Sequence, residues 1–299
     1  MVARAARKSS VIGPSGALRT RDTAASVFAR PFLKWVGGKG QLIASLDTQL
    51  PAELKLGQIE TYIEPFVGGG AVFFHIAQRY KVSRIIISDT NADLILAYRT
   101  IQKKPRQLGK VLRDLESTYL KLPEAGRSEF YYSIRNAFNE QRYHAHLSTL
   151  SNGSIERAAQ LIFLNKTCFN GLFRVNSSGA FNVAFGKYDN PTICDLENIL
   201  RVSEILESVE ILLGDFQQVQ DLTDESAFVY LDPPYRPLTE TANFTGYSAE
   251  TFTQLDQQRL AKFCKALTKQ QVRVLMSNSD PSNVDDSDKF FQRMYPGFN

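Results

Sequence analysis

The chain has 299 residues, of which 43% are hydrophobic and 22% charged, a composition typical of a globular protein with a large core. No apolar run approaches the roughly 18 residues that a transmembrane helix needs, and the N-terminus shows no signal-peptide pattern. The three cysteines are far apart and form no CxxC pair. The sequence therefore predicts a reducing compartment, with neither a disulfide framework nor a metal site.

The net charge of +4 is unevenly distributed. The first 30 residues hold six basic residues and one acidic residue, a net +5, so the remaining chain is net −1. The overall charge is therefore no argument for nucleic-acid binding, which would need local clusters of basic residues. Residues 1–29 are rich in Ala, Ser, Arg and Thr and lack periodicity, so they are predicted to form a disordered basic tail.

Ordered structure is expected from Arg30 onward, where an aromatic residue and a cation flank a glycine pair. Trp35 offers a stacking face and Lys39 an ammonium, and the two glycines between them allow a ligand to approach the backbone. The segment is not a Walker A loop, because the GxxxxGK[ST] spacing is absent.

A strand is predicted at 61–63, followed by a glycine-rich turn from Glu64 to Gly70 and a helix over about 71–80. This order is how α/β proteins bring backbone and a helix N-terminus against a nucleotide-like ligand. The turn is not GxGxxG, which disfavours a dinucleotide-dependent dehydrogenase. Asp89 follows the next predicted strand, 84–88, where it can accept hydrogen bonds from ribose hydroxyls; the alternative is that it caps the following helix.

Helical patterns dominate from Pro105 to about Leu164, and a polar, Gly-punctuated segment then follows, with Asn170, Arg174 and Lys187 in it. Asn pairs with adenine edges, and Arg or Lys pairs with guanine edges or phosphate. Long ordered loops are usually functional, so this segment is predicted to be a reading loop inserted into a nucleotide-binding domain.

The remaining predicted strands are 210–213, 227–231 and 272–276, with a helix from about Leu255 between the last two. Strands this apolar belong in a parallel sheet that is covered on both faces. The strand 227–231 runs into Asp232-Pro233-Pro234-Tyr235, and the prolines must end it. A carboxylate and a proline carbonyl can both accept hydrogen bonds from one exocyclic amine, while a tyrosine ring stacks on the base that carries it.

These motifs, in this order, resemble those of the DNA adenine methylase (Dam-type) family. The matching stretches are Phe32…Lys34-Trp35…Gly37-Gly38-Lys39, Glu64-Pro65-Phe66…Gly68-Gly69-Gly70, Asp89-Thr90-Asn91, Asp232-Pro233-Pro234-Tyr235 and Ala242-Asn243-Phe244-Thr245. The segment from Leu164 to Tyr188 is also similar to members that recognise GATC. The likeness covers roughly Arg30 to Asn299.

The resemblance implies an α/β fold: a Rossmann-like methyltransferase sheet with an inserted, mainly helical target-recognition domain. The domains would be the basic tail 1–29, a catalytic domain of 30–104 and 203–299, and a recognition domain of 105–202. The expected activity is transfer of a methyl group from S-adenosylmethionine to N6 of a flipped adenine in double-stranded DNA, in the sequence GATC. The family also implies a cytoplasmic, nucleoid-associated monomer from a bacterium or phage. Two alternatives stay open: a cognate restriction endonuclease as a genetic partner, or an enzyme that acts alone.

The resemblance also assigns roles to particular residues. The cofactor would be held by Trp35, Lys39, Glu64, Phe66, Gly68, Gly70, Asp89, Asp215, Phe216 and Asp232. Asp232 and Pro233 would grip the target amine while Tyr235 stacks on the base. Asn170, Leu172, Arg174, Asn176, Lys187 and Tyr188 would read or clamp the DNA. No metal ion is expected in the reaction.

Two departures from the family pattern leave alternatives open. The chain ends soon after the fifth predicted strand, where family members continue, so the catalytic domain is expected to be C-terminally truncated and the chain could be a weakly active or inactive DNA- or cofactor-binding remnant. Lys187 stands where GATC-type relatives often carry Arg, and Lys lacks the bidentate fork. A dehydrogenase remains as a further alternative, as does a transferase acting on protein or RNA amides, whose members usually have Asn where this chain has Asp232.

Overall fold

The computed structural model describes residues 28–35, 37, 39–141, 150–235, 252–278 and 289–297. Nearly all of the predicted basic tail lies outside these ranges, as do Gly38 and the stretch 242–245. Among the helices that the structure describes, none is both long and apolar enough to cross a bilayer.

Five parallel strands form one sheet in the order β3-β2-β1-β4-β5. The strands are β1 (Thr61–Glu64), β2 (Arg84–Asp89), β3 (Val209–Leu213), β4 (Ala227–Leu231) and β5 (Arg273–Met276). All five predicted strands and their parallel pairing are confirmed, and the boundaries differ from the predicted ones by one residue at most. The central position of β1 and β4 fits their burial at every residue.

The two faces of the sheet bury alternate side chains of these strands. Tyr62 and Phe228 lie in one hydrophobic cluster, and their neighbours Ile63 and Val229 lie in another. The first cluster includes α3 (Ala71–Arg79) and α4 (Ala92–Lys103), and the second includes α9 (Gln254–Lys269). Coverage of both faces explains why neighbouring positions of β1 and β4 are both apolar and do not alternate with polar ones.

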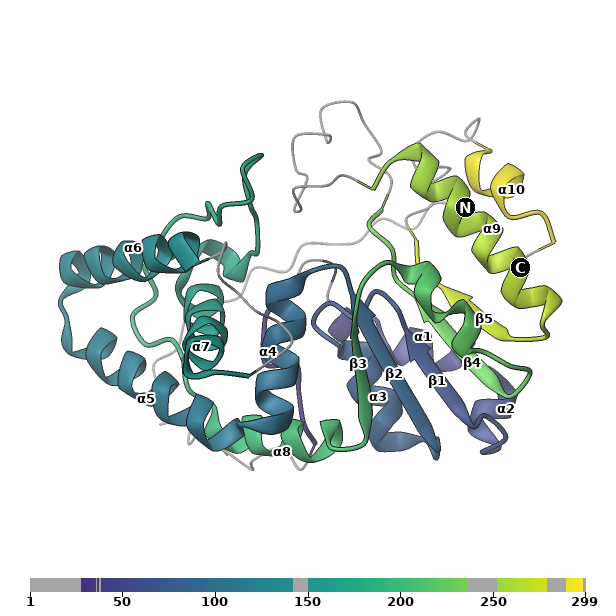
Figure 1. Cartoon of the computed structure of the whole chain (residues 1–299), viewed down its shortest axis with the longest axis horizontal. Helices are drawn as coiled ribbons and strands as arrows, with labels where there is room; N and C mark the ends of the chain where they lie inside the picture. Colours follow the sequence, from purple (N-terminus) through teal and green to yellow (C-terminus); the bar gives the residue numbers. More distant parts are fainter. Residues whose placement is uncertain are drawn as a thin grey trace, which may run out of the picture.

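The helices divide the molecule into two parts (Figure 1). Beside the sheet lie η1 (Lys39–Gln41), α1 (Ile43–Gln49), α2 (Ala52–Lys55), η4 (Phe216–Leu222) and α10 (Phe290–Met294). The other part holds α5 (Pro105–Lys121), α6 (Glu124–Glu140), α7 (Asn152–Thr167) and η3 (Phe169–Gly171), and α8 (Leu196–Leu206) follows it in the chain. Helix α4 packs against both α7 and α8, so it joins the two parts. The boundary placed at residue 202 falls inside α8.

The segment after α7 is a hairpin-like excursion. Antiparallel bridges join Cys168 to Phe185 and Val175 to Phe181. Helix α6 anchors its return arm: Asn139 exchanges two hydrogen bonds with the backbone of Phe181. The predicted reading loop is therefore an ordered segment that is fixed against α6. We call it the recognition hairpin (residues 168–188).

Candidate active site

The carboxyl ends of the parallel strands bring four acidic residues to one edge of the sheet. Glu64 ends β1 and Asp89 ends β2, while Asp215 follows β3 and Asp232 follows β4. Ligands of open α/β sheets bind at this edge. The parallel topology thus gathers acidic side chains that are distant in the sequence, as predicted.

Asp232 is paired with a buried lysine. Its Oδ2 atom lies 2.5 Å from Nζ of Lys39, which also donates a hydrogen bond to the carbonyl oxygen of Gly37 at 2.8 Å. The same Nζ lies 5.1 Å from the centroid of the Tyr235 ring. Burial raises the pKa of Asp232, and the charge of Lys39 opposes that rise. Pro233 is buried, whereas Tyr235 is 40% exposed, so the aromatic face stands at the entrance to this pair.

Glu64 is a buried carboxyl group beneath the pair. Its Oε2 accepts a hydrogen bond from the Tyr62 hydroxyl at 2.5 Å, and the backbone of Phe73, in the first turn of α3, supplies another. Burial is the largest influence and raises the pKa of Glu64 to about 8, against an ordinary value of 4.5. Near neutral pH the group is therefore mainly protonated.

The raised pKa of Glu64 predicts a pH-dependent stability. The folded state keeps the proton up to about pH 8, whereas the unfolded carboxyl loses it near 4.5. Stability from this group is complete below pH 4.5 and is lost as the pH rises toward 8, at up to roughly 1.4 kcal/mol per pH unit. We expect Glu64→Gln to be more stable than the wild type at pH 8 and similar at pH 4.5, as measured by urea unfolding without ligand. Parallel pH profiles would contradict the prediction.

The glycine turn is closed by two aromatic side chains. Gly68 has a φ of +49°, and a Cβ there would lie 2.8 Å from Cδ1 of Trp35. Gly70 has a φ of +74°, and a Cβ there would lie 2.5 Å from the Tyr98 hydroxyl. Both positions therefore require glycine, for conformation and for space. The sequence suggested that these glycines allow a ligand to approach. The structure adds a second reason for glycine, the close packing of Trp35 and Tyr98 against the turn.

Asp89 is fixed by backbone donors from this turn. Its two carboxylate oxygens accept hydrogen bonds from the N–H groups of Gly68 at 3.1 Å and Asn91 at 2.9 Å. Because an ionised carboxylate has about four acceptor sites, it keeps capacity for hydroxyl donors. The alternative helix-cap role is wrong, since Asn91 caps α4 by accepting from the N–H of Leu94.

Aromatic residues line the next part of the edge. Phe66 stacks on Phe216 with ring centroids 5.4 Å apart. Phe216 is only 2% exposed and lies under the guanidinium of Arg259 at 5.2 Å. Asp215 pairs with the same arginine at 2.8 Å and caps η4 through the N–H of Gln217. Arg259 was not foreseen, because nothing in its local sequence distinguishes it from other helix-surface arginines.

The residues predicted to read DNA lie on the recognition hairpin. Asn170, Arg174, Asn176 and Lys187 are exposed, while Leu172 and Tyr188 are half-buried. Nε of Arg174 donates to Oδ1 of Asn182 at 2.8 Å. Asn176 has an additional structural role, because its Oδ1 accepts three hydrogen bonds that close the hairpin turn, from Ser178 and Ala180.

Two residues of this hairpin other than glycine have left-handed backbone. Asn170 has a φ of 56° and Lys187 a φ of 54°. The N–H of Asn170 donates to the Tyr188 hydroxyl at 3.1 Å, which holds the two arms together. Lys187 pairs with Glu124 at 3.3 Å through two exposed side chains, so its ammonium remains available to other anions.

Lys34 and Asn165 connect the hairpin to the N-terminal segment 30–35, and the sequence did not single them out as site residues. Nζ of Lys34 lies 5.4 Å from the Tyr188 ring centroid. The buried Asn165 amide bonds the backbone N–H and C=O of Lys34 and the carbonyl of Gly171. Trp35 stacks on Phe173 at 5.2 Å, so one face of the Trp35 ring is taken by the protein.

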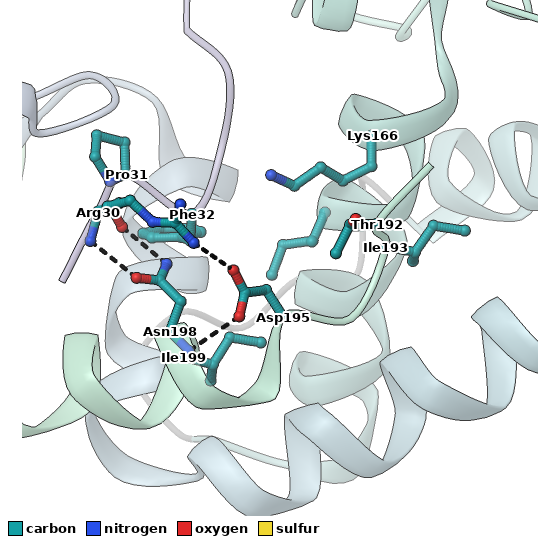
Figure 2. Close-up of a pocket in the computed structure, with 10 residues that line it drawn as sticks. Arg30, Pro31, Phe32, Lys166, Thr192, Ile193, Asp195, Asn198 and Ile199 are labelled. Atoms are coloured by element: carbon teal, nitrogen blue, oxygen red, sulfur yellow. Dashed lines mark hydrogen bonds and ion pairs between the residues drawn. The ribbon is translucent and has the colours of Figure 1, made fainter. Parts of the chain in front are cut away.

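A separate pocket of about 330 Å³ lies between residues 30–32, the end of α7 and the start of α8. Figure 2 shows Arg30 hydrogen-bonded to Asp195 and Asn198, with Lys166 extending toward the opening. None of the predicted site residues lines it. We place the candidate active site at the sheet edge because the acidic and aromatic side chains described above lie there. The described residues contain no group of His, Cys, Asp or Glu that could hold a metal ion.

Comparison with known proteins agrees with this geometry. A Type II methyltransferase, M.MjaIII, from Methanocaldococcus jannaschii is 47% identical over 270 residues, which is 90% of this chain and 89% of the relative. The Type II methyltransferase M1.LlaDCHI of Lactococcus lactis is 37% identical, over 88% of this chain and 85% of its own. The DNA adenine methylase of Escherichia coli K12 is 34% identical, over 84% and 81% respectively. The family model of D12 class N6 adenine-specific DNA methyltransferases matches residues 35–299. The chain belongs to the D12 class of N6 adenine-specific DNA methyltransferases.

Proposed function

We propose that this chain transfers a methyl group from S-adenosylmethionine to N6 of an adenine that has left the DNA duplex, within the sequence GATC. The observation that carries the proposal is the exit of β4, where the half-buried carboxylate of Asp232 is followed by buried Pro233 and by the exposed ring of Tyr235. Such an arrangement offers acceptors to an exocyclic amine and a face to a base.

The polar and aromatic side chains of the sheet edge support binding of this cofactor. Asp89 would accept the ribose hydroxyls, and the turn from Glu64 to Gly70 would lie against the rest of the molecule. Phe66, Asp215 and Phe216 would border its adenine; because Phe216 is buried, only its edge or backbone can make this contact. Trp35 and Lys39 would complete the pocket at the methionine end. The bound cofactor would supply an electrophilic methyl group.

The protein's part in the reaction is to position and polarise the amine. The nitrogen of an adenine amine is a poor nucleophile because its lone pair is delocalised into the ring. Hydrogen bonds from its two N–H groups to Asp232 and to the carbonyl of Pro233 favour a pyramidal nitrogen with an available lone pair. Tyr235 would stack on the ring and hold the nitrogen in line with the methyl group. Stacking and hydrogen bonds together offset the few kcal/mol that base flipping costs.

The test is methyl transfer to two matched duplexes, one with GATC and one with that site scrambled, using labelled S-adenosylmethionine. We expect label on adenine in the first duplex only. Equal labelling of both would refute GATC selectivity, and labelling of neither would refute the activity. The names of the Type II relatives also favour a cognate restriction endonuclease as a genetic partner, and we propose that the enzyme acts as a monomer on DNA.

Arg174 is proposed to read a base edge, since its guanidinium is exposed on the hairpin and oriented by Asn182. We predict that Arg174→Ala lowers the ratio of GATC to scrambled methylation by roughly tenfold or more, because a bidentate base contact contributes about 1–3 kcal/mol of discrimination. The measurement is kcat/KM on both duplexes. Lys187→Ala serves as the comparison, with a smaller effect on the ratio. An equal loss on all sequences would make Arg174 a phosphate contact only.

A further inference from the structure

A buried ammonium lies against the carboxylate that the proposed reaction needs. The side chain of Lys39 is only 6% exposed, and its Nζ atom lies 2.5 Å from Oδ2 of Asp232. It donates a second hydrogen bond to the Gly37 carbonyl and lies 5.1 Å from the centroid of the Tyr235 ring. Contacts from two distant segments of the chain therefore hold this ammonium in place.

The target base requires the same position, next to Asp232 and Tyr235, that the Lys39 ammonium occupies. An adenine that offers its amine to Asp232 and its ring to Tyr235 needs the same neighbours that Lys39 has now. An ammonium and an amine are both hydrogen-bond donors, so one can replace the other without leaving the carboxylate unpaired. A base with a carbonyl in place of the amine would set an acceptor against the carboxylate, and it cannot make this exchange.

We infer that Lys39 takes the place of the target base in the free enzyme: its ammonium donates a hydrogen bond to the carboxylate of Asp232 until the adenine amine displaces it. The inference rests on the proposed function and adds a positioning residue to it. Before DNA binds, Lys39 keeps a half-buried carboxylate paired, which avoids the cost of an isolated charge away from water. When a base enters, the pair admits only a partner that donates a hydrogen bond.

The charges around Asp232 support this role. Burial raises the pKa of Asp232, and the ion pair and hydrogen bond with Lys39 oppose the rise. The other titratable groups that face it are Glu64, Tyr230 and Tyr235. The first is mainly protonated near neutral pH, since its pKa is raised to about 8. Lys39 is thus the cation that balances Asp232 among the residues that the structure describes.

The test measures how much the target base contributes to DNA affinity in Lys39→Met and Lys39→Arg. Two GATC duplexes are compared, one with adenine at the target position and one with an abasic site, each bound at alkaline pH with S-adenosylhomocysteine. The dissociation constant of the abasic duplex divided by that of the adenine duplex isolates the gain in affinity from the base, because all other contacts cancel. We call this quotient the affinity ratio. In Lys39→Met the amine meets an unpaired carboxylate, so we expect this ratio to rise about tenfold or more. Lys39→Arg should stay near the wild type.

A second readout is the single-turnover rate against pH. Without its cation, Asp232 takes up a proton more readily, so the acid limb of Lys39→Met should lie at higher pH. Lys262→Met, which removes an exposed lysine of α9, controls for the loss of one positive charge. An unchanged affinity ratio would overturn the inference. A weaker affinity for S-adenosylhomocysteine with an unchanged ratio would make Lys39 a cofactor contact only.

A third variant covers the case in which Lys39→Met does not fold. Asp232→Asn keeps the lysine but weakens its hold, because the ion pair becomes a hydrogen bond between an ammonium and a neutral amide, a larger loss than that of the bond from the adenine amine to the same position. The affinity ratio should then rise as well, and a ratio equal to the wild type would overturn the inference. Wild-type methyl transfer is measured separately: its absence refutes the proposed function, whereas its presence with unchanged ratios refutes the role of Lys39 alone.

Discussion

Asp232→Ala should reduce methyl transfer by roughly a thousandfold, the size expected when a group that stabilises the reacting atoms is removed. The carboxylate stands at the carboxyl end of β4, and Lys39 opposes the rise in its pKa that burial causes. Without it, the adenine amine loses its strongest acceptor and only the Pro233 carbonyl remains. The measurement is the single-turnover rate with labelled S-adenosylmethionine on a GATC duplex.

Binding of the cofactor should survive the same substitution. Asp89 and the glycine turn are held by β1, β2 and Tyr98, and the hydrogen bonds that join them do not involve Asp232. We expect the dissociation constant for S-adenosylhomocysteine to change by less than about tenfold, as measured by calorimetry. Asp114→Ala, which removes an exposed carboxylate on α5, is the matched control. Near-full activity in Asp232→Ala would refute the catalytic role.

Asp232→Asn separates the charge from the hydrogen bond. The amide oxygen can still accept from the adenine amine, but a neutral acceptor forms a weaker bond than a carboxylate. We expect a rate between those of the wild type and Asp232→Ala. If both variants lose the same activity, the negative charge is what the reaction requires.

Local patterns were enough to predict the elements that lie along the sheet. The run Ala227–Leu231 is apolar at every position and is ended by prolines, so its bounds followed from the sequence alone. Likewise α9 was predicted from about Leu255, and in the structure Thr253 and Asp256 form a capping box at its start. At Asp89 the local pattern allowed two roles; the helix-cap role was excluded only by the structure, in which Asn91 caps α4, and the ribose role stays a prediction.

Contacts between distant residues could not be predicted in the same way. Lys39 and Asp232 are 193 positions apart, and no periodicity links them. Their pairing depends on where the parallel sheet places the end of β4 beside the N-terminal segment. The order of the strands has the same origin, since pairing between strands is set by packing over the whole sheet and not by any one strand. The sequence therefore predicted the strands and the side chains that follow them, but not which of these side chains contact one another.

The sequence also did not predict the role of Arg157, which joins α7 to α4 through a buried ion pair. Its guanidinium bonds both carboxylate oxygens of Asp93, in the first turn of α4, at 2.6 and 3.0 Å. It also donates to the carbonyl of Phe138 and lies 4.1 Å from that ring. The Arg157 side chain is 5% exposed, so no solvent can replace these bonds.

Arg157→Met should lower the free energy of unfolding by about 3 kcal/mol, because it leaves the partner carboxylate of Asp93 largely buried and unpaired. The matched control is Arg84→Met on β2, whose pair with Glu210 is bidentate but more than 40% exposed; the expected loss there is below about 1 kcal/mol. Urea unfolding at pH 7 measures both. Similar losses in the two variants would show that burial does not decide the contribution of the pair.

The double variant Arg157→Met with Asp93→Asn completes the test. Removing both charges leaves no isolated carboxylate, so the double variant should be less destabilised than the sum of the two single variants. Asp93 lies four residues after Asp89, and Arg157 lies eight before Asn165, which bonds Gly171 of the recognition hairpin. The pair therefore fixes the helix that follows the proposed ribose site against the helix that leads into the recognition hairpin. If so, Arg157→Met should also weaken the preference for GATC over scrambled DNA, although Arg157 itself touches neither proposed site.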